Sequence, residues 1–325
     1  MDIELRHIHK RFGPIHANND INLTFKGGRI IGVLGENGAG KSTLMKILSG
    51  FQPADSGEIL VGGRSVHYVG PQSAIQFGIG MLQQDPLDVP AFTVLENFIY
   101  GHGSGLGMNR KKARTQLNII NRRFGFDLDA ETPVSQLTIA QRQQLEIGRL
   151  LTLGVRTLIL DEPTTGISSE QKELLFEALH EISQHDGMTV LIVSHKLEDV
   201  VALCNEVVVL RAGKVVGERQ MPATTKQLVA MMFGEELTVQ TKEQQAIKEK
   251  RTSDREIVVL ERVSLREKRL HIDNLSMRVY AGQIIGLAGL DGSGQELVMR
   301  ACVGLAKTHG GRVLVEGRDM TGRPY

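Results

Sequence analysis

Near-continuous apolar runs alternate with amphipathic stretches along much of the chain. The runs Arg29 to Leu34, Thr157 to Leu160 and Thr189 to Val193 each have the length of one buried strand, whereas Asn109 to Phe124 and Ser169 to His185 carry apolar residues at helical spacing. Strands that are apolar throughout are typical of a parallel sheet covered on both faces. The pattern therefore predicts an α/β domain around a parallel sheet.

The clearest predicted helix lies between Asn109, a capping residue, and Gly125, a stop signal. Its apolar stripe consists of Ala113, Leu117, Ile120 and Phe124. The basic residues of this segment lie largely off the stripe, and they are Arg110, Lys111, Lys112, Arg114, Arg122 and Arg123. A solvated helix face explains them more simply than a site for a polyanion. The region from about Thr93 to Leu153 is expected to be mainly helical.

Shorter patterns predict further strands and an internal repeat. The expected strands are Ile3–Ile8, Ile21–Phe25, Glu58–Val61, Glu256–Val263, Leu275–Tyr280, Gln283–Leu287 and Arg312–Glu316. The polar segment 238–255 is expected to be a linker. Beyond it, GLDGSGQE (Gly289 to Glu296) resembles GENGAGKS in the first part of the chain. We therefore expect one full domain (1–237, with a helical part at about 85–153) and the opening of a second domain (256–325).

Composition excludes several classes of function. The net charge of +1, the 4% aromatic content and the absence of Trp give no general attraction for nucleic acid and no stacking platform for bases. The two cysteines, Cys204 and Cys302, match no metal-binding spacing, and both are expected to be core residues. No signal peptide and no apolar run of about 20 residues is present, so a soluble cytosolic chain is expected.

The segment Gly35 to Thr43 reads GENGAGKST and follows the first buried run directly. Glycines allow the backbone to curl with its N–H groups turned inward, and the helix after the loop adds its positive dipole end. Lys41 would supply a point charge for the outer phosphates, and Ser42 a hydroxyl for Mg²⁺. This strand, loop and helix setting predicts a phosphate-binding loop rather than a plain glycine turn.

Polar groups follow the other two buried runs at the corresponding point. Asp161 and Glu162 come after one run, and Ser194 and His195 after the other. Because ligands of parallel sheets bind beyond the carboxyl ends of the strands, these groups are expected to meet the glycine loop at one site. Asp161 would hold Mg²⁺, usually through water, and Glu162 would act as the base that polarises the attacking water.

The order of a phosphate loop, LILDEPT and SH resembles that of the ATP-binding-cassette (ABC) ATPases. The segment Leu137 to Gln141, LTIAQ, departs from this family's LSGGQ signature but resembles the variant of carbohydrate-type importers. The resemblance implies a P-loop NTPase fold with a RecA-like parallel sheet core, an antiparallel β subdomain and a helical subdomain. It also implies that the chain binds ATP and Mg²⁺.

The resemblance further implies roles for individual residues. Gln84, with Gln83 as the alternative, would contact Mg²⁺ and water, and His195 would contact the γ-phosphate. Phe12 would stack on adenine, unless it is a core residue. The remaining implied nucleotide contacts are Gly35, Glu36, Asn37, Gly38, Ala39, Gly40, Lys41, Ser42 and Thr43, together with Thr138, Ala140 and Gln141 of the signature across a dimer. Thr138 is also compatible with an ordinary helix cap.

Two departures from the family pattern fit the carbohydrate-type importers. Thr165 to Ser168 lacks the common aspartate of this segment, and Ser168 with Gln171 predicts a helix-capping pair instead. In the second loop Gln295 replaces the lysine and Glu296 the serine, so little or no ATP hydrolysis is expected there.

The resemblance implies an ATPase that powers import of a sugar or nucleoside-like solute from the cytoplasmic face of the membrane. Its partners would be membrane permease subunits, indirectly an extracytoplasmic solute-binding protein, and a second cassette in cis or in a homodimer. The alternative is a non-transport ABC protein of translation or DNA repair, which the lost lysine of the second loop and the lack of room for a long coiled coil disfavour. A pure binding module would not need Glu162.

Overall fold

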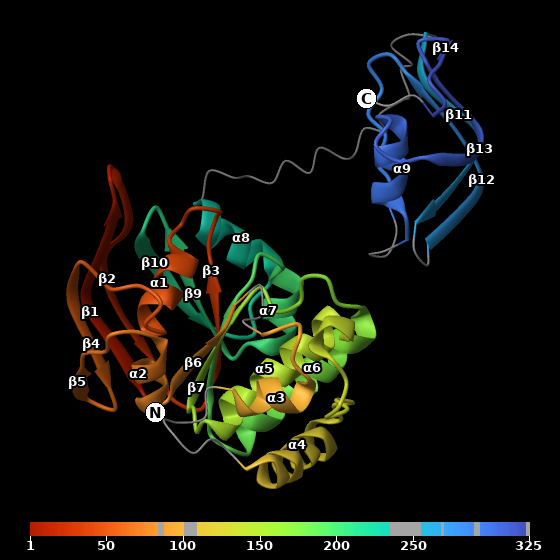
Figure 1. The fold of residues 1–325 in the computed structure, drawn as a ribbon. Helices are drawn as coiled ribbons and strands as arrows, with labels where there is room; N and C mark the ends of the chain where they lie inside the picture. The colour runs from red at the N-terminus through yellow and green to blue at the C-terminus, as the bar shows by residue number, and fades with distance from the viewer. Residues whose placement is uncertain (84–87, 101–108, 235–254, 268–269, 289–292, 323–325) are drawn as a thin grey trace. The chain divides into compact units, whose positions relative to one another are not determined.

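The computed structural model describes residues 1–83, 88–100, 109–234, 255–267, 270–288 and 293–322 (Figure 1). The chain divides into two compact units, Met1–Thr238 and Val239–Tyr325. The expected linker, 238–255, lies at this division, and all of it except its last residue is outside the described residues. The domain limits 1–237 and 256–325 stay predictions.

A six-stranded sheet forms the centre of the first unit, in the order β10-β9-β3-β8-β7-β6. Its strands are β3 (Ile30–Leu34), β6 (Ile79–Leu82), β7 (Thr157–Asp161), β8 (Thr189–Val193), β9 (Glu206–Arg211) and β10 (Lys214–Gln220). All neighbouring pairs are parallel except β9 and β10. The three apolar runs lie side by side as β3, β8 and β7, so the predicted parallel sheet is confirmed. β6, β9 and β10 are strands that the sequence analysis did not predict.

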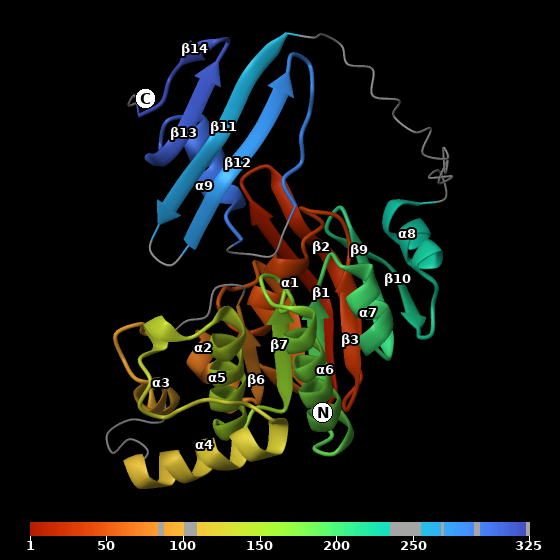
Figure 2. The ribbon, with the colours of Figure 1, turned by 90° about the vertical axis from the view of Figure 1, so that its right-hand side faces the viewer.

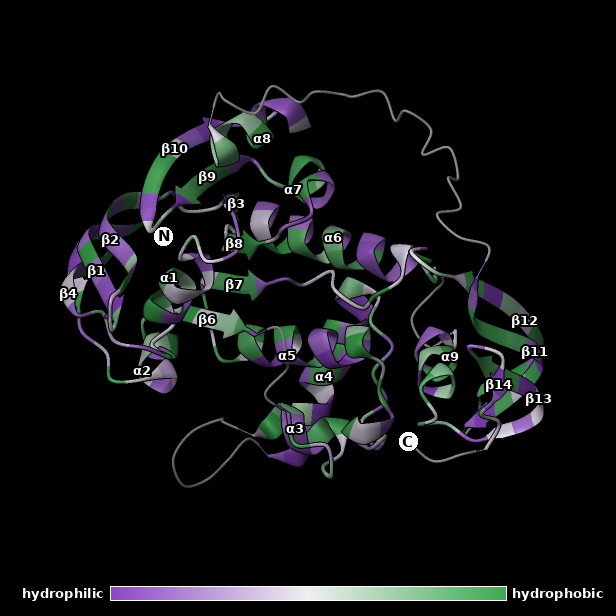
Figure 3. Ribbon diagram, turned by 90° about the horizontal axis from the view of Figure 1, so that it is seen from above, coloured by the Kyte–Doolittle hydropathy of each residue, from purple (hydrophilic) through white to green (hydrophobic). Residues whose placement is uncertain are grey.

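The central strands are buried on both faces because their side chains alternate between two hydrophobic cores. Ile30 and Leu34 of β3 belong to the core on the side of the helices, and Ile31 and Val33 to the core on the other side. β7 and β8 alternate in the same way, and they are coloured as hydrophobic in Figure 3. This double burial explains why consecutive positions in the middle of these strands are apolar, rather than every second one.

The second core lies between the central sheet and a four-stranded antiparallel sheet of order β2-β1-β4-β5. Its strands are β1 (Ile3–Phe12), β2 (Ile15–Phe25), β4 (Ser56–Val61) and β5 (Arg64–Val66). Helix α1 (Lys41–Leu48) contributes Leu44, Met45, Ile47 and Leu48 to this core. In Figure 1 the antiparallel sheet and the helices α3 to α6 lie on opposite sides of the central sheet.

The remaining helices of the first unit are α2 (Pro71–Gln76), α3 (Val94–Ile99), α4 (Arg110–Phe124), α5 (Ile139–Thr152), α6 (Ser169–Gln184), α7 (Leu197–Leu203) and α8 (Thr225–Phe233), with a short 3₁₀ turn at Val134–Gln136. Asn109 caps α4, and Gly125 ends it with φ 66°, as expected. Ala113, Leu117, Ile120 and Phe124 are the buried stripe of this helix. Figure 2 shows α7 and α8 beside β9 and β10. Among the described helices, none combines the length and apolarity that a membrane crossing requires.

The second unit repeats the antiparallel sheet of the first. Its strands are β11 (Glu256–Glu267), β12 (Leu270–Tyr280), β13 (Thr308–Val315) and β14 (Arg318–Asp319), in the order β12-β11-β13-β14. Helix α9 (Gln295–Cys302) begins after Gly294, whose φ and ψ of 106° and 5° nearly equal the 98° and 5° of Gly40 before α1. The resemblance between the two glycine segments therefore extends to the backbone of the helix start.

The predicted strand Gln283–Leu287 is wrong. These residues belong to no strand, and Ile284 is 98% exposed. The corresponding strand of the first unit, β3, is held between β8 and β9, which lie more than 150 residues further along the chain. No such neighbours occur among the described residues of the second unit, so an apolar pattern alone does not make a strand here.

Candidate functional site

The loop between β3 and α1 is built on three glycines with positive φ. Gly35, Gly38 and Gly40 have φ of 148°, 82° and 98°. A Cβ at Gly35 would lie 2.2 Å from the carbonyl oxygen of Leu210, and a Cβ at Gly40 would lie 2.1 Å from that of Ala17. The loop thus packs directly against β9 and β2, and only glycine combines this conformation with this close approach.

The start of α1 and the ammonium group of Lys41 give the loop positive charge. No side chain caps the helix, so its first N–H groups and its dipole favour an anion. Lys41 Nζ donates hydrogen bonds to the carbonyl oxygens of Gly35 (2.8 Å) and Glu36 (2.9 Å). Burial lowers the pKa of Lys41, while the charges of Glu162 and Asp161 act in the opposite direction. Lysine and both carboxylates therefore share one site.

Asp161 ends β7 beside the hydroxyl of Ser42 in α1. Ser42 Oγ lies 3.5 Å from Asp161 Oδ1 and donates a long hydrogen bond to it. Burial, and to a lesser degree the charge of Glu162, raises the pKa of Asp161, although the Ser42 hydrogen bond opposes this. The carboxylate is thus short of solvation and lies near a like charge, although the charges of Lys46 and Lys41 partly offset this, and a bound cation would favour its ionised form.

Glu162 and His195 come from neighbouring strands and meet above the sheet edge. Glu162 has a φ of 52°, and its N–H donates to the carbonyl oxygen of Val193 (2.9 Å). Glu162 Oε2 and His195 Nδ1 are 2.8 Å apart, which suits an ion pair when the imidazole is protonated. The alignment is not that of a hydrogen bond, and among the described residues Oε2 is buried without a hydrogen-bond donor. A water molecule is one donor that could satisfy it.

We expect the variant Asp161→Asn to have a higher melting temperature than the parent in the absence of nucleotide. A raised pKa means that the folded chain holds this proton more tightly than the unfolded chain, so stability falls as pH rises from 3.8 through the raised value. Asparagine has no proton to release, so the variant does not lose this stability as the pH rises. Melting curves of both proteins between about pH 4 and pH 8 should diverge as pH rises, and equal curves throughout would contradict the expectation.

The signature segment starts α5 and forms a complete capping box. Thr138 Oγ1 accepts from the N–H of Gln141 (3.2 Å), and Gln141 Oε1 accepts from the N–H of Thr138 (3.0 Å). Ala140 is buried. The compatible role of Thr138 as a helix cap is confirmed, as is the capping pair of Ser168 and Gln171. Within the described chain, no hydrogen bond or ion pair joins the start of α5 to the glycine loop.

Two further predicted residues have different outcomes. Phe12 ends β1 and is 47% exposed, so the alternative of a core residue is wrong, and Lys10 Nζ lies 5.8 Å from its ring centre. Gln84 lies outside the described residues, whereas Gln83 directly follows β6, which pairs with β7. The position of Gln84 relative to Asp161 therefore stays a prediction.

The sequence analysis missed Asn18 of β2, which supports the loop. It is fully buried, and its Nδ2 donates to the carbonyl oxygen of Gly40 (3.1 Å). Its Oδ1 has no hydrogen-bond partner among the described residues. The available signal was an asparagine within a strand in which Ile21, Leu23 and Phe25 face the core. That asparagine is indistinguishable by type from its neighbour Asn19, which is only half-buried.

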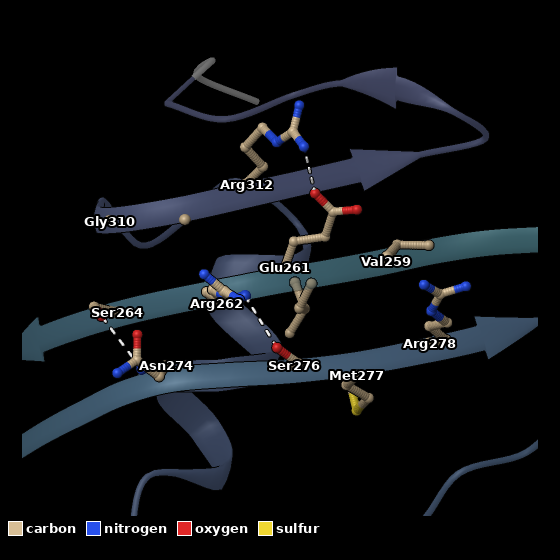
Figure 4. Close-up of a pocket in the computed structure, with 12 residues that line it drawn as sticks. Val259, Glu261, Arg262, Ser264, Asn274, Ser276, Met277, Arg278, Gly310 and Arg312 are labelled. Atoms are coloured by element: carbon tan, nitrogen blue, oxygen red, sulfur yellow. Dashed lines mark hydrogen bonds and ion pairs between the residues drawn. The ribbon is translucent and has the colours of Figure 1, made fainter.

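A hollow of about 890 Å³ lies elsewhere, on the outer face of β11, β12 and β13 (Figure 4). Arg312 pairs with Glu261 (2.8 Å), and Ser276 Oγ accepts from the N–H of Arg262 (3.1 Å). None of the predicted site residues lines it. The hollow follows a bulge at Arg262, which has a positive φ of 49°, and the first antiparallel sheet has a corresponding bulge at His7, with φ 51°. It is thus a consequence of sheet curvature.

Comparison with known proteins finds relatives along nearly the whole chain. It is 35% identical to the ribose import ATP-binding protein RbsA of Chromobacterium violaceum and 33% identical to the nucleoside import ATP-binding protein NupA of Lactococcus lactis. It is also 33% identical to the glucose import ATP-binding protein TsgD13 of Haloferax volcanii. Each match covers 98% of this chain but only 63% of the relative. The chain therefore spans less than two thirds of their length.

Solved structures and a family model agree with these relatives. An ATP-binding cassette of an ABC transporter in its ADP conformation has a TM-score of 0.63 at 23% identity, covering 72% of this chain and all of that one, which shows the shared fold. CbiO1 from Clostridium perfringens, part of an ABC transporter complex, has a TM-score of 0.59 at 25% identity over 67% of this chain and 88% of its own. The model described as ABC transporter matches residues 18–165, from β2 past the glycine loop to the acids after β7. Residues 18–165 of the chain therefore form a domain of the ABC transporter family.

Proposed function

We propose that this chain is the ATP-hydrolysing subunit of an importer for a sugar or a nucleoside-like solute. The observation that carries the proposal is the meeting of the glycine loop, Lys41, Asp161, Glu162 and His195 at one edge of the central sheet. Such a constellation suits a triphosphate and a water molecule, because it combines an anion cradle, a cation and a base. The relatives named above are import ATP-binding proteins, which supports import as the purpose.

In the proposed reaction, the phosphates of ATP occupy the loop from Gly35 to Thr43. The loop N–H groups and Lys41 Nζ would stabilise the charge on the transferring phosphoryl group once Nζ exchanges its loop carbonyls for phosphate oxygens. Glu162 Oε2, which lacks a donor in the described structure, would accept the proton of the attacking water. His195 and Gln84 would contact the γ-phosphate and the water, and Phe12 would stack on adenine.

The donor set of Ser42 and Asp161 fits Mg²⁺. Both offer oxygen atoms, and a cation would compensate the lost solvation of the buried Asp161 carboxylate. Among the described residues, no group of three histidine, cysteine, aspartate or glutamate side chains is arranged for a metal. Two protein oxygens suffice for Mg²⁺, because it keeps several waters and takes one or two protein ligands plus phosphate oxygens. When bound, it would neutralise charge on the outer phosphates.

A second cassette would complete the site. Thr138, Ala140 and Gln141 make no polar contact with the glycine loop of their own chain, so their proposed contact with ATP requires another copy or another cassette. The start of α5 supports this assignment, because its first N–H groups and dipole favour phosphate.

Membrane permease subunits are the proposed partners, docked near Gln84 on the cytoplasmic face, with an extracytoplasmic solute-binding protein acting indirectly. A groove of about 440 Å³ beside β6, the strand that leads to Gln84, supports this location. It is lined by apolar side chains, including the exposed Phe51 and Tyr100, and by the ion pair of Glu146 and Arg149. The relatives named above are all import proteins, so the alternative in translation or DNA repair has no support.

ATP hydrolysis per molecule is expected to rise with protein concentration, because paired copies would complete each other's sites. The test is the steady-state release of phosphate from Mg²⁺-ATP across a broad concentration range, with ATP binding measured in parallel. A failure of ATP to bind at millimolar concentration would overturn the proposed function. Fast hydrolysis that is independent of concentration would instead overturn the proposed pairing. Screening sugars and nucleosides for stimulation of the chain purified with its permease would then identify the solute.

A further inference from the structure

A buried carboxylate that has no part in the proposed reaction lies behind the site. Asp199 of α7 is 5% exposed and receives two side-chain hydrogen bonds. Thr164 Oγ1 donates to its Oδ2 at 2.6 Å, and Lys172 Nζ of α6 lies 3.1 Å from its Oδ1. Thr164 is itself 3% exposed. A buried charge persists only where such partners compensate its lost hydration.

This network joins the two segments that carry the site. Thr164 follows Glu162 by two residues, and Asp199 follows His195 by four. A second link runs in the other direction, because Lys196 Nζ donates to the carbonyl oxygen of Thr164 (2.9 Å). The segment after β7 is therefore tied twice to the segment after β8, directly beyond the carboxylate and imidazole that lie 2.8 Å apart.

Glu162 needs such support because its backbone is strained. Its φ of 52° lies in the left-handed region, which is unfavourable for residues that carry a Cβ. The N–H of Glu162 donates to Val193, and its carbonyl oxygen accepts from the N–H of Thr165 (3.2 Å). A strained conformation persists only where the surrounding contacts fix it, and the hydrogen bond from Thr164 to Asp199 fixes the chain two residues after Glu162.

We propose that Asp199 is a positioning residue that, through Thr164, holds the carboxylate of Glu162 against His195 in the geometry for water activation. This inference rests on the proposed ATPase function. Asp199 would touch neither ATP nor water, so its removal would alter the rate of hydrolysis rather than the binding of ATP. Misplacement of a reacting group by about 1 Å costs on the order of 100-fold in rate.

The test compares Asp199→Asn and Thr164→Val with Thr164→Ser and Glu198→Gln in the full chain. Serine keeps the donating hydroxyl group, and Glu198 is the exposed acid next to Asp199 in α7. We expect Asp199→Asn and Thr164→Val to lower kcat about 10- to 100-fold, with KM and the Kd for ATP changed less than about twofold. Thr164→Ser and Glu198→Gln should behave as the parent. Rates are expressed per ATP-binding site, so that unfolded protein does not count.

Two further measurements test whether Asp199 positions Glu162 or only stabilises the fold. They also distinguish failure of this inference from failure of the proposed ATPase function. In a Glu162→Gln background, Asp199→Asn should give no additional loss of rate, because both changes act through one carboxylate. The NMR signal of the His195 imidazole, assigned with His195→Gln, should move in Asp199→Asn and stay in Glu198→Gln. A parental kcat in Asp199→Asn, or an unmoved imidazole signal, would overturn the inference. An inactive parent with a moved signal would overturn only the ATPase proposal.

Discussion

Replacing Glu162 with glutamine should leave ATP binding intact and slow hydrolysis by about 10²- to 10⁴-fold, the range expected for loss of a general base. The amide keeps the size of the side chain but has no basic oxygen for the proton of water. Glu162 is also the acid that lies 2.8 Å from His195 and has a buried oxygen without a donor among the described residues. Phosphate release in a single turnover measures the rate of the chemical step directly.

The matched control is Glu170→Gln, which changes an exposed acid in the first turn of α6. It should hydrolyse ATP at the parental rate. If Glu162→Gln also does so, another group is the base. If both variants lose ATP binding, the charge of this region rather than proton transfer explains the effect.

Gly40→Ala should destabilise the first unit far more than Gly38→Ala, although both residues have positive φ. An alanine Cβ at position 40 would lie 2.1 Å from the carbonyl oxygen of Ala17, whereas a Cβ at position 38 meets no atom within 4 Å. The left-handed conformation alone costs about 1 to 2 kcal/mol. Displacement of the β2 backbone should bring the loss of unfolding free energy at Gly40 to about 3 to 5 kcal/mol.

Urea unfolding followed by circular dichroism measures both values, and ATP binding supplies an independent result. Gly38→Ala should retain most of the stability yet bind ATP more weakly, because its new methyl group would occupy the open side of the loop where phosphate is proposed to lie. Equal losses of unfolding free energy in the two variants would show that the close approach of position 40 to the carbonyl oxygen of Ala17 does not contribute to stability.

Much of the first unit could be predicted because its signals are local and repeated. The runs at β3, β7 and β8 are almost entirely apolar, and their carboxyl ends are marked by a glycine loop, an acid pair and the pair Ser194-His195 respectively. β6 and β9 were not predicted although their central residues are apolar, because β6 has only four residues and β9 begins and ends with a charged residue. Gln283–Leu287 has the right pattern but no neighbouring strands within the described part of the second unit, and pairing partners are a property of the whole sheet rather than of the segment.

The parts of the site that could not be predicted depend on contacts between distant segments. Asp199 resembles any acid in a first helical turn, and only the fold brings Thr164 and Lys172 to it. The left-handed backbone of Glu162 likewise has no sequence signal, since glutamate rarely adopts it. The same limit holds for Asn18, whose neighbour Asn19 has the same side chain in a different place.

The alternation of β3 between two hydrophobic cores also links folding to activity. Ile31 and Val33 depend on the layer that contains α1, and Ile30 and Leu34 on the layer that contains the helices. A mutation that disrupts either layer therefore removes the packing contacts of one face of β3, the strand that ends at the glycine loop. Nucleotide affinity should vanish together with the cooperative melting of the first unit, which makes a fluorescent ATP analogue a practical gauge of how much of a preparation is intact.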